Sequence, residues 1–569
     1  MNIDFTPPSS TAVVGAFVFV VDGVNAEIFN QMLTAGELPS IQKYFVDRGL
    51  YVKKAVANIP SITLANLPSL ATGKFPGHHG ITGINWFDRQ KLILRDYATI
   101  AQKNTLDGDY LETKNIFEYF PNQLTASLFF QPNRGATKFY ENRLTAGPAF
   151  WIQDYKLVDR ISLWRFNKLM KLARHKNKFP VMVYNYTLAP DFHAYKYGSD
   201  SKEYKQALLH IDKQIGRLLA DVKRAGILNK IYIALVSDHS MGPVKYHFKM
   251  DNFLRATGLC LAEKKLWESS SQYTRKSYYA KFDAVACTCG DRYTALYLRK
   301  PNWKNFESAS AISSASADQK SLKLNESKPF FDWSVRPNEQ DLKCYPLYFQ
   351  SGKKSSYKPR RSKNPFIIPS RNKTPIEKES KFFTGNLIQI LRAQPAVDLI
   401  AWSAGKDKCK IANKIGIAEF SQPGGKLSDV TYTVLEGKDP LGYGVKAGKE
   451  NSVTLSVRNW LAKTIDTKFP GIAAPMVAYF RAKRAGDIAI FASPGWDFKT
   501  VNLSGHGGVR GYDDLCVPIL LAGPGVKKSQ IKTAYTTDLP ITLLKLLGKK
   551  IPPDSDGKVL PNCQNKSAK

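Results

Sequence analysis

The chain has 569 residues, of which 43% are hydrophobic and 12% aromatic, and this composition excludes a disordered protein. Its length exceeds that of one simple hydrophobic core and predicts roughly two to three domains. The 82 lysines and arginines outnumber the 48 aspartates and glutamates, and the net charge of +34 favours polyanionic partners: nucleic acid, anionic membrane surfaces or phosphorylated small molecules.

The amino-terminal apolar run, residues 12–21, is preceded by no lysine or arginine. It is too short to cross a bilayer, and it lacks the basic start and the small-residue cleavage site of a secretory signal. The seven cysteines are an odd, scattered set, which favours reduced thiols in a reducing compartment. The sequence therefore predicts a cytoplasmic protein, or one exported without an amino-terminal signal, and no transmembrane helix.

Short, continuous apolar runs recur along the first half of the chain and again near its end. Continuous rather than alternating hydrophobicity is typical of buried parallel strands. Between them lie amphipathic segments such as residues 204–226, whose apolar residues repeat at helical spacing. This alternation predicts an α/β fold with a mostly parallel sheet flanked by helices. The runs are residues 16–22, 52–60, 124–131, 181–191, 231–239, 487–493 and 517–525.

Strand signals weaken in the middle of the chain and resume near residue 486. We therefore predict an α/β core in two parts, residues 1–255 and 481–569, interrupted by a smaller cap-like insertion over residues 256–480. Within the insertion, residues 353–381 carry ten lysines and arginines against two glutamates. We interpret this basic loop as a solvated surface segment, and the alternative is a docking site for a phosphate-rich partner.

Polar side chains follow several of the predicted strands at the point where each strand ends. In open α/β sheets these ends converge and bind ligands. Carboxylates and imidazoles are the usual ligands of Zn²⁺ and related ions, and five of them are about enough for two metals roughly 3.5–4 Å apart, as phosphoryl displacement requires. The candidates are Asp22, Asp191, Asp238, His239 and, in the glycine-rich segment SGHGGVRG, His506.

Thr63 opens the helix-like segment that continues as LANLPSLATG. The amino terminus of a helix offers free N–H groups and a favourable dipole to a phosphate. A hydroxyl placed there, next to a metal, could attack phosphorus, and the alternative is an ordinary helix cap. The adjacent His78 and His79 are interpreted as structural residues of the following turn.

Six segments, in the same order along the chain, resemble the alkaline phosphatase superfamily and more narrowly its type I phosphodiesterase/nucleotide pyrophosphatase branch. The resemblance covers about residues 16–255 and 395–560, and it implies an alkaline-phosphatase-like core. The segments are VVDG, PSITLANLPSLATGKFPGHHGITGINWFD, APDFHAYKYG, VSDHSMG, SGHGG and TTDLPITLLKLLGKKIPPDSDGKVL.

The resemblance implies two metal sites, with Asp22, Thr63, Asp238 and His239 as ligands in the first, and Asp191, His506 and one further histidine in the second. The family places that histidine four residues after the aspartate, where this chain has Tyr195. His193 is the expected substitute ligand, and the alternatives are a weakened second site or a catalytically impaired protein. The expected cofactors are two divalent ions, most simply zinc, with manganese or another metal as the alternative.

The resemblance also bears on the substrate. Alkaline phosphatases use a serine and an arginine, whereas this chain offers a threonine with no arginine in the following helix. Asn85 matches, with a shift of about one residue, the asparagine that diesterases of this branch use as a neutral donor to the oxyanion. A metal-dependent hydrolase of phosphodiester or pyrophosphate bonds, acting through a phospho-threonine intermediate, is therefore expected.

Two alternative functions remain. One is a phosphomonoesterase or a phospholipase C-like hydrolase on the same site, and the other is an impaired, basic binding protein. The expected partner is a phosphate-containing small molecule or a lipid headgroup, with an anionic membrane surface or nucleic acid at the basic patches. Residues 155–178 are predicted to form a packed helix with a solvated basic face, and a membrane-surface helix is the alternative.

Overall fold

The computed structural model describes residues 13, 15–99, 102–110, 112–140, 147–175, 179–263, 266–301, 331–350, 380–426 and 428–564. Nearly all of the basic loop predicted over residues 353–381 lies outside these described residues, so its interpretation stays a prediction. Within the described part of the chain, we find no helix whose length and apolar character would let it cross a bilayer. All seven cysteines carry free thiols.

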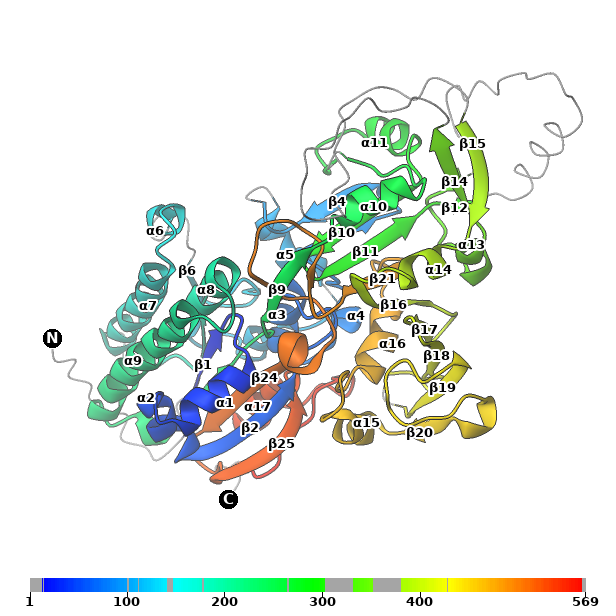
Figure 1. The fold of residues 1–569 in the computed structure, drawn as a ribbon. Coiled ribbons are helices and arrows are strands. Elements are labelled where there is room, and N and C mark those ends of the chain that lie inside the picture. Colours follow the sequence, from blue (N-terminus) through cyan, green and yellow to red (C-terminus); the bar gives the residue numbers. More distant parts are fainter. Residues whose placement is uncertain are drawn as a thin grey trace, which may run out of the picture.

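The first of two eight-stranded sheets forms the α/β core (Figure 1). Across the sheet its strands are β25 (Ser529–Tyr535), β2 (Gly49–Val56), β24 (Cys516–Ala522), β8 (Ile231–Val236), β1 (Gly15–Val21), β7 (Met182–Thr187), β5 (Thr125–Leu128) and β6 (Lys138–Tyr140). β1 runs parallel to both of its neighbours, β7 and β8. β24 is the exception in this mostly parallel sheet, because it runs antiparallel to β2 and β8.

Helices cover both faces of this sheet, as the side chains of β1 show. Phe17 and Phe19 pack on one face against α1 (Ala26–Thr34), α7 (Tyr155–His175) and α9 (Lys202–Arg224). Ala16 and Val18 pack on the other face, with α3 (Thr63–Thr72) and α17 (Asp538–Leu546). A strand buried on both faces has no polar alternation, which is why the apolar runs are continuous. The predicted α/β class is confirmed.

The second sheet is built largely from the predicted insertion. Its strands, in order, are β10 (Ala284–Cys289), β11 (Tyr293–Leu298), β21 (Ile488–Ala492), β16 (Val397–Ser403), β17 (Lys408–Ala412), β18 (Gly416–Ser421), β19 (Val430–Gly437) and β20 (Val453–Leu455). All of its pairings are antiparallel. β21 follows the predicted boundary at residue 480 and yet pairs here. Its apolar run was expected in the parallel core, but continuous hydrophobicity reports burial on both faces and not the choice of sheet.

Smaller elements join the two sheets or extend from them. The helices are α2 (Pro39–Ile41), α4 (Pro76–His79), α5 (Leu106–Asp109), α6 (Gly147–Trp151), α8 (Ala189–Tyr197), α10 (Met250–Ala256), α11 (Gln272–Tyr279), α13 (Glu339–Lys343), α14 (Leu387–Arg392), α15 (Val457–Thr464) and α16 (Ala473–Arg481). The strands are β3 (Asn85–Asp88), β4 (Ile93–Asp96), β9 (Gly242–His247), β12 (Lys300–Pro301), β13 (Phe331–Asp332), β14 (Tyr345–Gln350), β15 (Ser380–Gly385), β22 (Gly495–Asp497) and β23 (Ser504–Gly505).

A buried ion pair fastens the β3–β4 hairpin to the second sheet. Arg89 donates from Nη2 to both carboxylate oxygens of Asp487, at 2.8 and 2.7 Å. The same carboxylate accepts the backbone N–H of Leu298 in β11 at 2.7 Å. Both charged side chains are almost completely buried. Removal of one partner from such a pair leaves the other charge in a medium that solvates it poorly.

We expect Arg89→Ala to lower the free energy of unfolding by about 3 kcal/mol, because Asp487 stays buried with only the more distant Arg336, whose Nε lies 4.0 Å from Oδ1, as a cationic partner in the described structure. Lys91→Ala is the matched control. The Lys91 ammonium lies 3.7 Å from Glu268, and its side chain is 62% exposed, so its loss should cost less than about 1 kcal/mol. Urea denaturation of both variants measures the difference. Equal midpoints would show that the buried pair does not hold the hairpin.

Candidate active site

Thr63 is the one open position in an otherwise buried stretch of chain. Between Ala55 and Pro76 every other residue is buried. The backbone reaches Thr63 in an extended conformation at Ile62, and α3 then begins. The amide of Asn66 donates to the carbonyl oxygen of Pro60 at 2.9 Å and so holds the turn before the helix. The fold therefore fixes the place of this hydroxyl and leaves it accessible.

Asp22, Asp238 and His239 come together beside Thr63. The pairing of Val20 with Val236 puts the ends of β1 and β8 side by side, so the aspartates two residues later are neighbours. His239 Nε2 lies 3.3 Å from Asp22 Oδ1 and 3.5 Å from Asp238 Oδ2. It lies 2.9 Å from Thr63 Oγ1. The four side chains thus face one small space. This agrees with the prediction that polar residues at the ends of the strands converge.

The carboxylates in this group are buried and incompletely hydrogen-bonded. Within the described part of the chain, Asp22 Oδ1 and both carboxylate oxygens of Asp238 have no hydrogen-bond partner. Burial and the neighbouring Asp238 charge raise the pKa of Asp22. Burial raises the pKa of Asp238 to about 7. Such oxygens are costly to bury unless they are protonated or bind a cation.

The spacing of these atoms fits a metal ion. Tetrahedral zinc with bonds of about 2.0–2.2 Å holds its ligand atoms roughly 3.4 Å apart. The separations from His239 Nε2 to the two carboxylates, 3.3 and 3.5 Å, have that size. The unpartnered oxygens are the hard, anionic donors that such an ion requires. The donor set and its geometry therefore fit a divalent cation.

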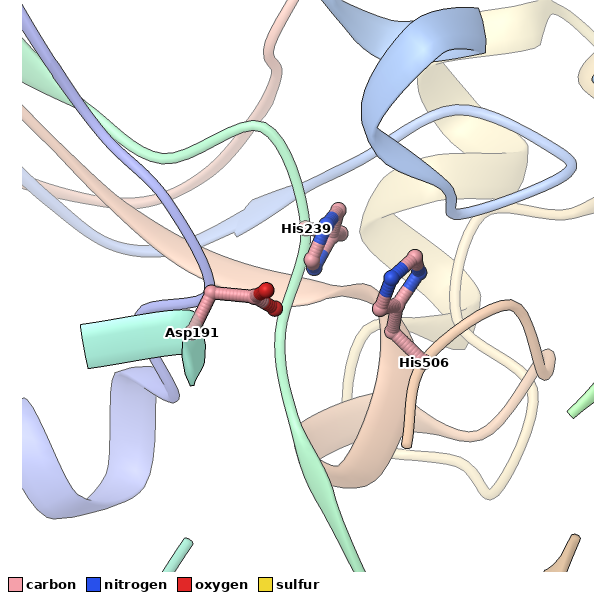
Figure 2. A group of neighbouring side chains, drawn as sticks. All are labelled: Asp191, His239 and His506. Carbon is pink, nitrogen blue, oxygen red and sulfur yellow. The ribbon is translucent and has the colours of Figure 1, made fainter. Parts of the chain in front are cut away.

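A second group lies next to the first and shares His239 with it. Asp191, in the first turn of α8, points toward the imidazoles of His239 and His506 (Figure 2). The two imidazole rings stack with their centroids 3.7 Å apart. Burial and the neighbouring His239 hold the pKa of His506 well below its usual range, so the ring is neutral and can act as a ligand. Asp191 Oδ1 also lacks a hydrogen-bond partner among the described residues.

His193 and Tyr195 both follow Asp191 in α8 and could each complete the second group, but their side chains point in different directions. His193 lies outside both groups, and its Nδ1 contacts the carbonyl oxygen of Ala189 at 2.7 Å. Tyr195 faces inward, with its ring 5.8 Å from the ring of His506. Successive turns of a helix bring residues i and i+4 to one face, whereas residue i+2 is rotated by about 200°. The helix therefore presents Tyr195 beside Asp191 and turns His193 away.

The second sheet holds His506 in place. His506 donates its backbone N–H to the carbonyl oxygen of Gly290 at 2.8 Å, and Arg292 donates its own to that of His506 at 3.1 Å. A side chain at Gly290 would come within 2.5 Å of His506 Nδ1, and the positive φ of 58° also favours glycine. The side chain of Arg292 is fully buried beside Asp514, with Nε 3.3 Å from Oδ1.

Sequence reasoning missed these supporting residues. Gly290 and Arg292 lie in the predicted insertion, where the only local signal is the Gly-Asp turn in CGDRY. The insertion also reaches Asn85, the predicted oxyanion donor, which opens β3 and is half-buried. Cys289 Sγ lies 2.9 Å from Asn85 Oδ1. The Cys289 thiol thus contacts the oxygen of the Asn85 amide.

Comparison with known proteins agrees with this geometry. Ectonucleotide pyrophosphatase/phosphodiesterase family member 3 of Bos taurus is 26% identical over 39% of this chain and 24% of its own length. The venom phosphodiesterase of Naja atra is 25% identical over 52% of this chain and 35% of its own length. The chain thus spans well under half of the length of the curated relatives it matches.

Solved structures match over nearly the whole chain. The murine ectonucleotide pyrophosphatase/phosphodiesterase 5 has a TM-score of 0.51 at 13% identity, covering 95% of this chain and 96% of its own. The human protein of the same name has a TM-score of 0.52, also at 13% identity, covering 97% and 98%. At such identity these likenesses show the shared fold.

The family model described as type I phosphodiesterase/nucleotide pyrophosphatase matches residues 16–381, which is more than half of the chain. This range includes Asp22, Thr63, Asp191 and the Asp238–His239 pair, the residues that the structure gathers at the strand ends. The chain belongs to the type I phosphodiesterase/nucleotide pyrophosphatase family.

Proposed function

We propose that this chain is a metal-dependent hydrolase of phosphodiester or pyrophosphate bonds that uses Thr63 as its nucleophile. The observation that carries the proposal is the position of the Thr63 hydroxyl. It is the accessible group of a buried stretch, it lies 2.9 Å from His239 Nε2, and it adjoins carboxylates whose oxygens lack partners. Ile62 holds the cap position of α3 and Thr63 is the first residue of the helix, so Thr63 is not an ordinary helix cap, and its hydroxyl contacts His239 instead.

The proposed ligand sets follow the two groups of side chains. Asp22, Thr63, Asp238 and His239 would hold one divalent ion, and Asp191 and His506 would hold a second, with Tyr195 at its remaining side. When bound, such ions lower the pKa of a hydroxyl and neutralise phosphate charge. Zinc is the proposed metal because carboxylate and imidazole donors suit it, and manganese is the alternative.

The residues of the chain would divide the work of the first step. His239 Nδ1 contacts the carbonyl oxygen of Ser240 at 3.1 Å, which favours a proton there and leaves the lone pair of Nε2, 2.9 Å from Thr63 Oγ1, free to bind the proposed metal ion beside the hydroxyl. Burial keeps the pKa of His239 below its usual range, so the ring is neutral before reaction. The backbone N–H groups of Thr63 and Leu64 precede the first hydrogen bonds of α3 and would receive phosphate oxygens.

The proposed reaction then runs in two displacements. Thr63 Oγ1 would lose its proton to solvent and form a bond to phosphorus as the bond to the leaving oxygen breaks, and the leaving oxygen would take a proton from solvent. In the second displacement water would attack the phosphorus of the phospho-threonine and the bond to Oγ1 would break. The hydroxyl of the water stays on the phosphoryl product, and its other proton passes through solvent to Thr63 Oγ1. Asn85 would donate its amide N–H to a non-bridging oxygen, a neutral contact that suits the single charge of a diester.

The choice of diester over monoester rests on the charges near Thr63. No lysine or arginine occurs in α3, so no cation of that helix matches the second charge of a monoester. Among the structural relatives, an inactive threonine-to-alanine variant of the murine protein is in complex with AMP. Nucleotide diesters and pyrophosphates are therefore the first substrates to test. A phospholipase C-like activity and a non-catalytic binding protein are the competing functions.

Replacement of the nucleophile tests the proposal directly. We expect Thr63→Ala to lower kcat on bis-p-nitrophenyl phosphate by on the order of 10³-fold or more, and Thr63→Ser to retain part of it. Thr99→Ala, which changes a half-buried threonine in a turn, should leave kcat unchanged. Mass spectrometry of wild type acid-quenched during turnover should find a p-nitrophenyl phosphoryl group on Thr63. An Ala variant that hydrolyses diester at the wild-type rate would disprove the proposed nucleophile.

Asn85 should matter to the transition state more than to binding. We expect Asn85→Ala to lower kcat on a diester by about 10²–10³-fold with little change in KM, because a donor to developing charge is lost. Cys289→Ala keeps the amide and removes only its thiol partner, so its effect should be much smaller. A raised KM with normal kcat in the Asn85 variant would assign the residue to substrate binding instead.

Tyr195→His should strengthen the second metal site, because it puts an imidazole one helical turn after Asp191 on the same face. We expect zinc retained after dialysis, measured by mass spectrometry, to rise toward two ions per chain, with at least about tenfold tighter binding of the second. His193→Ala should leave the metal content unchanged. Loss of zinc in the His193 variant would instead make His193 a ligand and contradict the proposed set.

A further inference from the structure

The segment formed by α6 and the outer face of α7 exposes large apolar side chains. Trp151 is 88% exposed, Ile152 is 68% exposed and Trp164 is 52% exposed. Single exposed apolar residues are ordinary, but two tryptophans and an isoleucine close together in the chain are not. Figure 1 shows α6 at the outer end of α7, away from the central sheet.

The exposed face of α7 is also strongly basic. Lys156, Arg160, Trp164 and Lys168 follow one another at steps of four residues, which places them along one stripe of the helix. Arg165 and Lys168 lie over the ring of Trp164, at 5.0 and 5.5 Å from its centroid. The opposite face of α7 is buried against the first sheet through Phe166 and its neighbours.

Acidic side chains are few beside this stripe in the described part of the chain. The described residues of α6 and α7 and the turn between them include two aspartates, Asp154 and Asp159. Asp159 is fully buried, and its carboxylate accepts the backbone N–H groups of Leu188 and Ala189 at the start of α8. Asp154 accepts the backbone N–H of Leu157 at 2.9 Å in the first turn of α7. Arg160 and Lys168 are exposed and Lys156 is half-buried, whereas Asp154 is the one aspartate of these described residues that is not fully buried, so positive charge outweighs negative charge on this face.

From these observations we infer that the α6–α7 surface, defined by Trp151, Ile152, Lys156, Arg160, Trp164 and Lys168, docks on an anionic lipid bilayer. Tryptophan and isoleucine enter the boundary between headgroups and acyl chains, and lysine and arginine meet the anionic headgroups above it. A nucleic-acid surface would need the same cations, but an exposed isoleucine at its tip would gain nothing from phosphates or bases. The inference does not depend on the proposed hydrolase activity.

The docking surface is connected to the candidate active site. Tyr155, the first residue of α7, stacks on Phe192 with ring centroids 4.0 Å apart and planes at 15°. Phe192 is the neighbour of Asp191 in α8. At the other end of α8, Lys196 donates to Gln153 Oε1 at 3.3 Å. Gln153 is the residue that follows Ile152 of the docking surface. A docked bilayer would therefore contact the segment that packs on the helix carrying Asp191.

Vesicle flotation of the full chain tests the inference. Wild type should float with vesicles of phosphatidylcholine and phosphatidylglycerol, and bind vesicles of phosphatidylcholine alone at least tenfold more weakly. Arg160→Glu/Lys168→Glu should weaken binding to the anionic vesicles at least tenfold, and Trp151→Ser/Ile152→Ser at least fivefold. The tryptophan fluorescence of wild type should shift to the blue on binding, and this shift should shrink in the Trp151 variant.

Matched controls use exposed residues elsewhere on the protein. Tyr273→Ser changes an 83% exposed aromatic residue in α11, and Lys446→Glu/Lys449→Glu reverses two exposed charges in the loop before β20. Both should bind anionic vesicles like wild type. Equal losses in the control and docking variants would overturn the inference, because net charge alone would then explain binding. The inference would also be overturned if wild type does not bind vesicles but binds single-stranded RNA through Arg160 and Lys168.

Turnover of a soluble diester separates this inference from the proposed function. Trp151→Ser/Ile152→Ser lies outside the proposed ligand sets, so it should hydrolyse bis-p-nitrophenyl phosphate at the wild-type rate while it loses vesicle binding. If wild type binds vesicles and hydrolyses no phosphoester, the docking surface stands and the proposed function fails. If hydrolysis is normal and wild type does not bind anionic vesicles, the docking surface is refuted alone.

Discussion

Three aspartate carboxylates share a buried space where β1 and β8 end and α8 begins, and their mutual repulsion has to be offset. Burial and neighbouring carboxylates raise the pKa values of both Asp22 and Asp191. The ion pairs of Asp22 and Asp238 in the described structure are with His239, a neutral ring when its pKa is lowered. Such a cluster is stable only if it is protonated or holds cations, and the proposed metal ions would meet the second condition.

Both sheets position residues of this cluster. The first sheet delivers the aspartates through the register of β1 with β8, and the second sheet positions His506 through the backbone of Gly290 and Arg292. Cys289, next to Gly290, also holds the amide of Asn85. The Arg89–Asp487 pair ties these parts together away from the reacting groups. The turn between β10 and β11 therefore borders the site, and its stability bears directly on the positions of His506 and Asn85.

The sequence was sufficient to predict individual strands and the polar residues at their ends. It was insufficient to predict which strands pair and which distant residues come into contact. Apolar runs that end in Asp22 and Asp238 indicated buried strands with ligands at their ends. This was possible because the apolar residues of each strand and the aspartate that follows them are neighbours in the sequence. The pairing of β21 with the second sheet, and the contact of Gly290 with His506, join residues far apart in the chain and leave no local pattern. The orientation of His193 was within reach, since a helix that includes Asp191 turns residue i+2 away.

Tyr195 makes the two halves of the site unequal. An imidazole at this position would offer a lone pair, whereas burial and Asp191 raise the pKa of the Tyr195 phenol well above its usual value, so it remains a protonated donor. In the proposed assignment, Thr63 therefore keeps a full set of ligands beside it, while the group around Asp191 and His506 has one fewer. In that assignment, activation of Thr63 would depend on the complete group. The group around Asp191 and His506 would bind its ion more weakly, because the Tyr195 phenol replaces the imidazole that the resemblance to the family implies at this position.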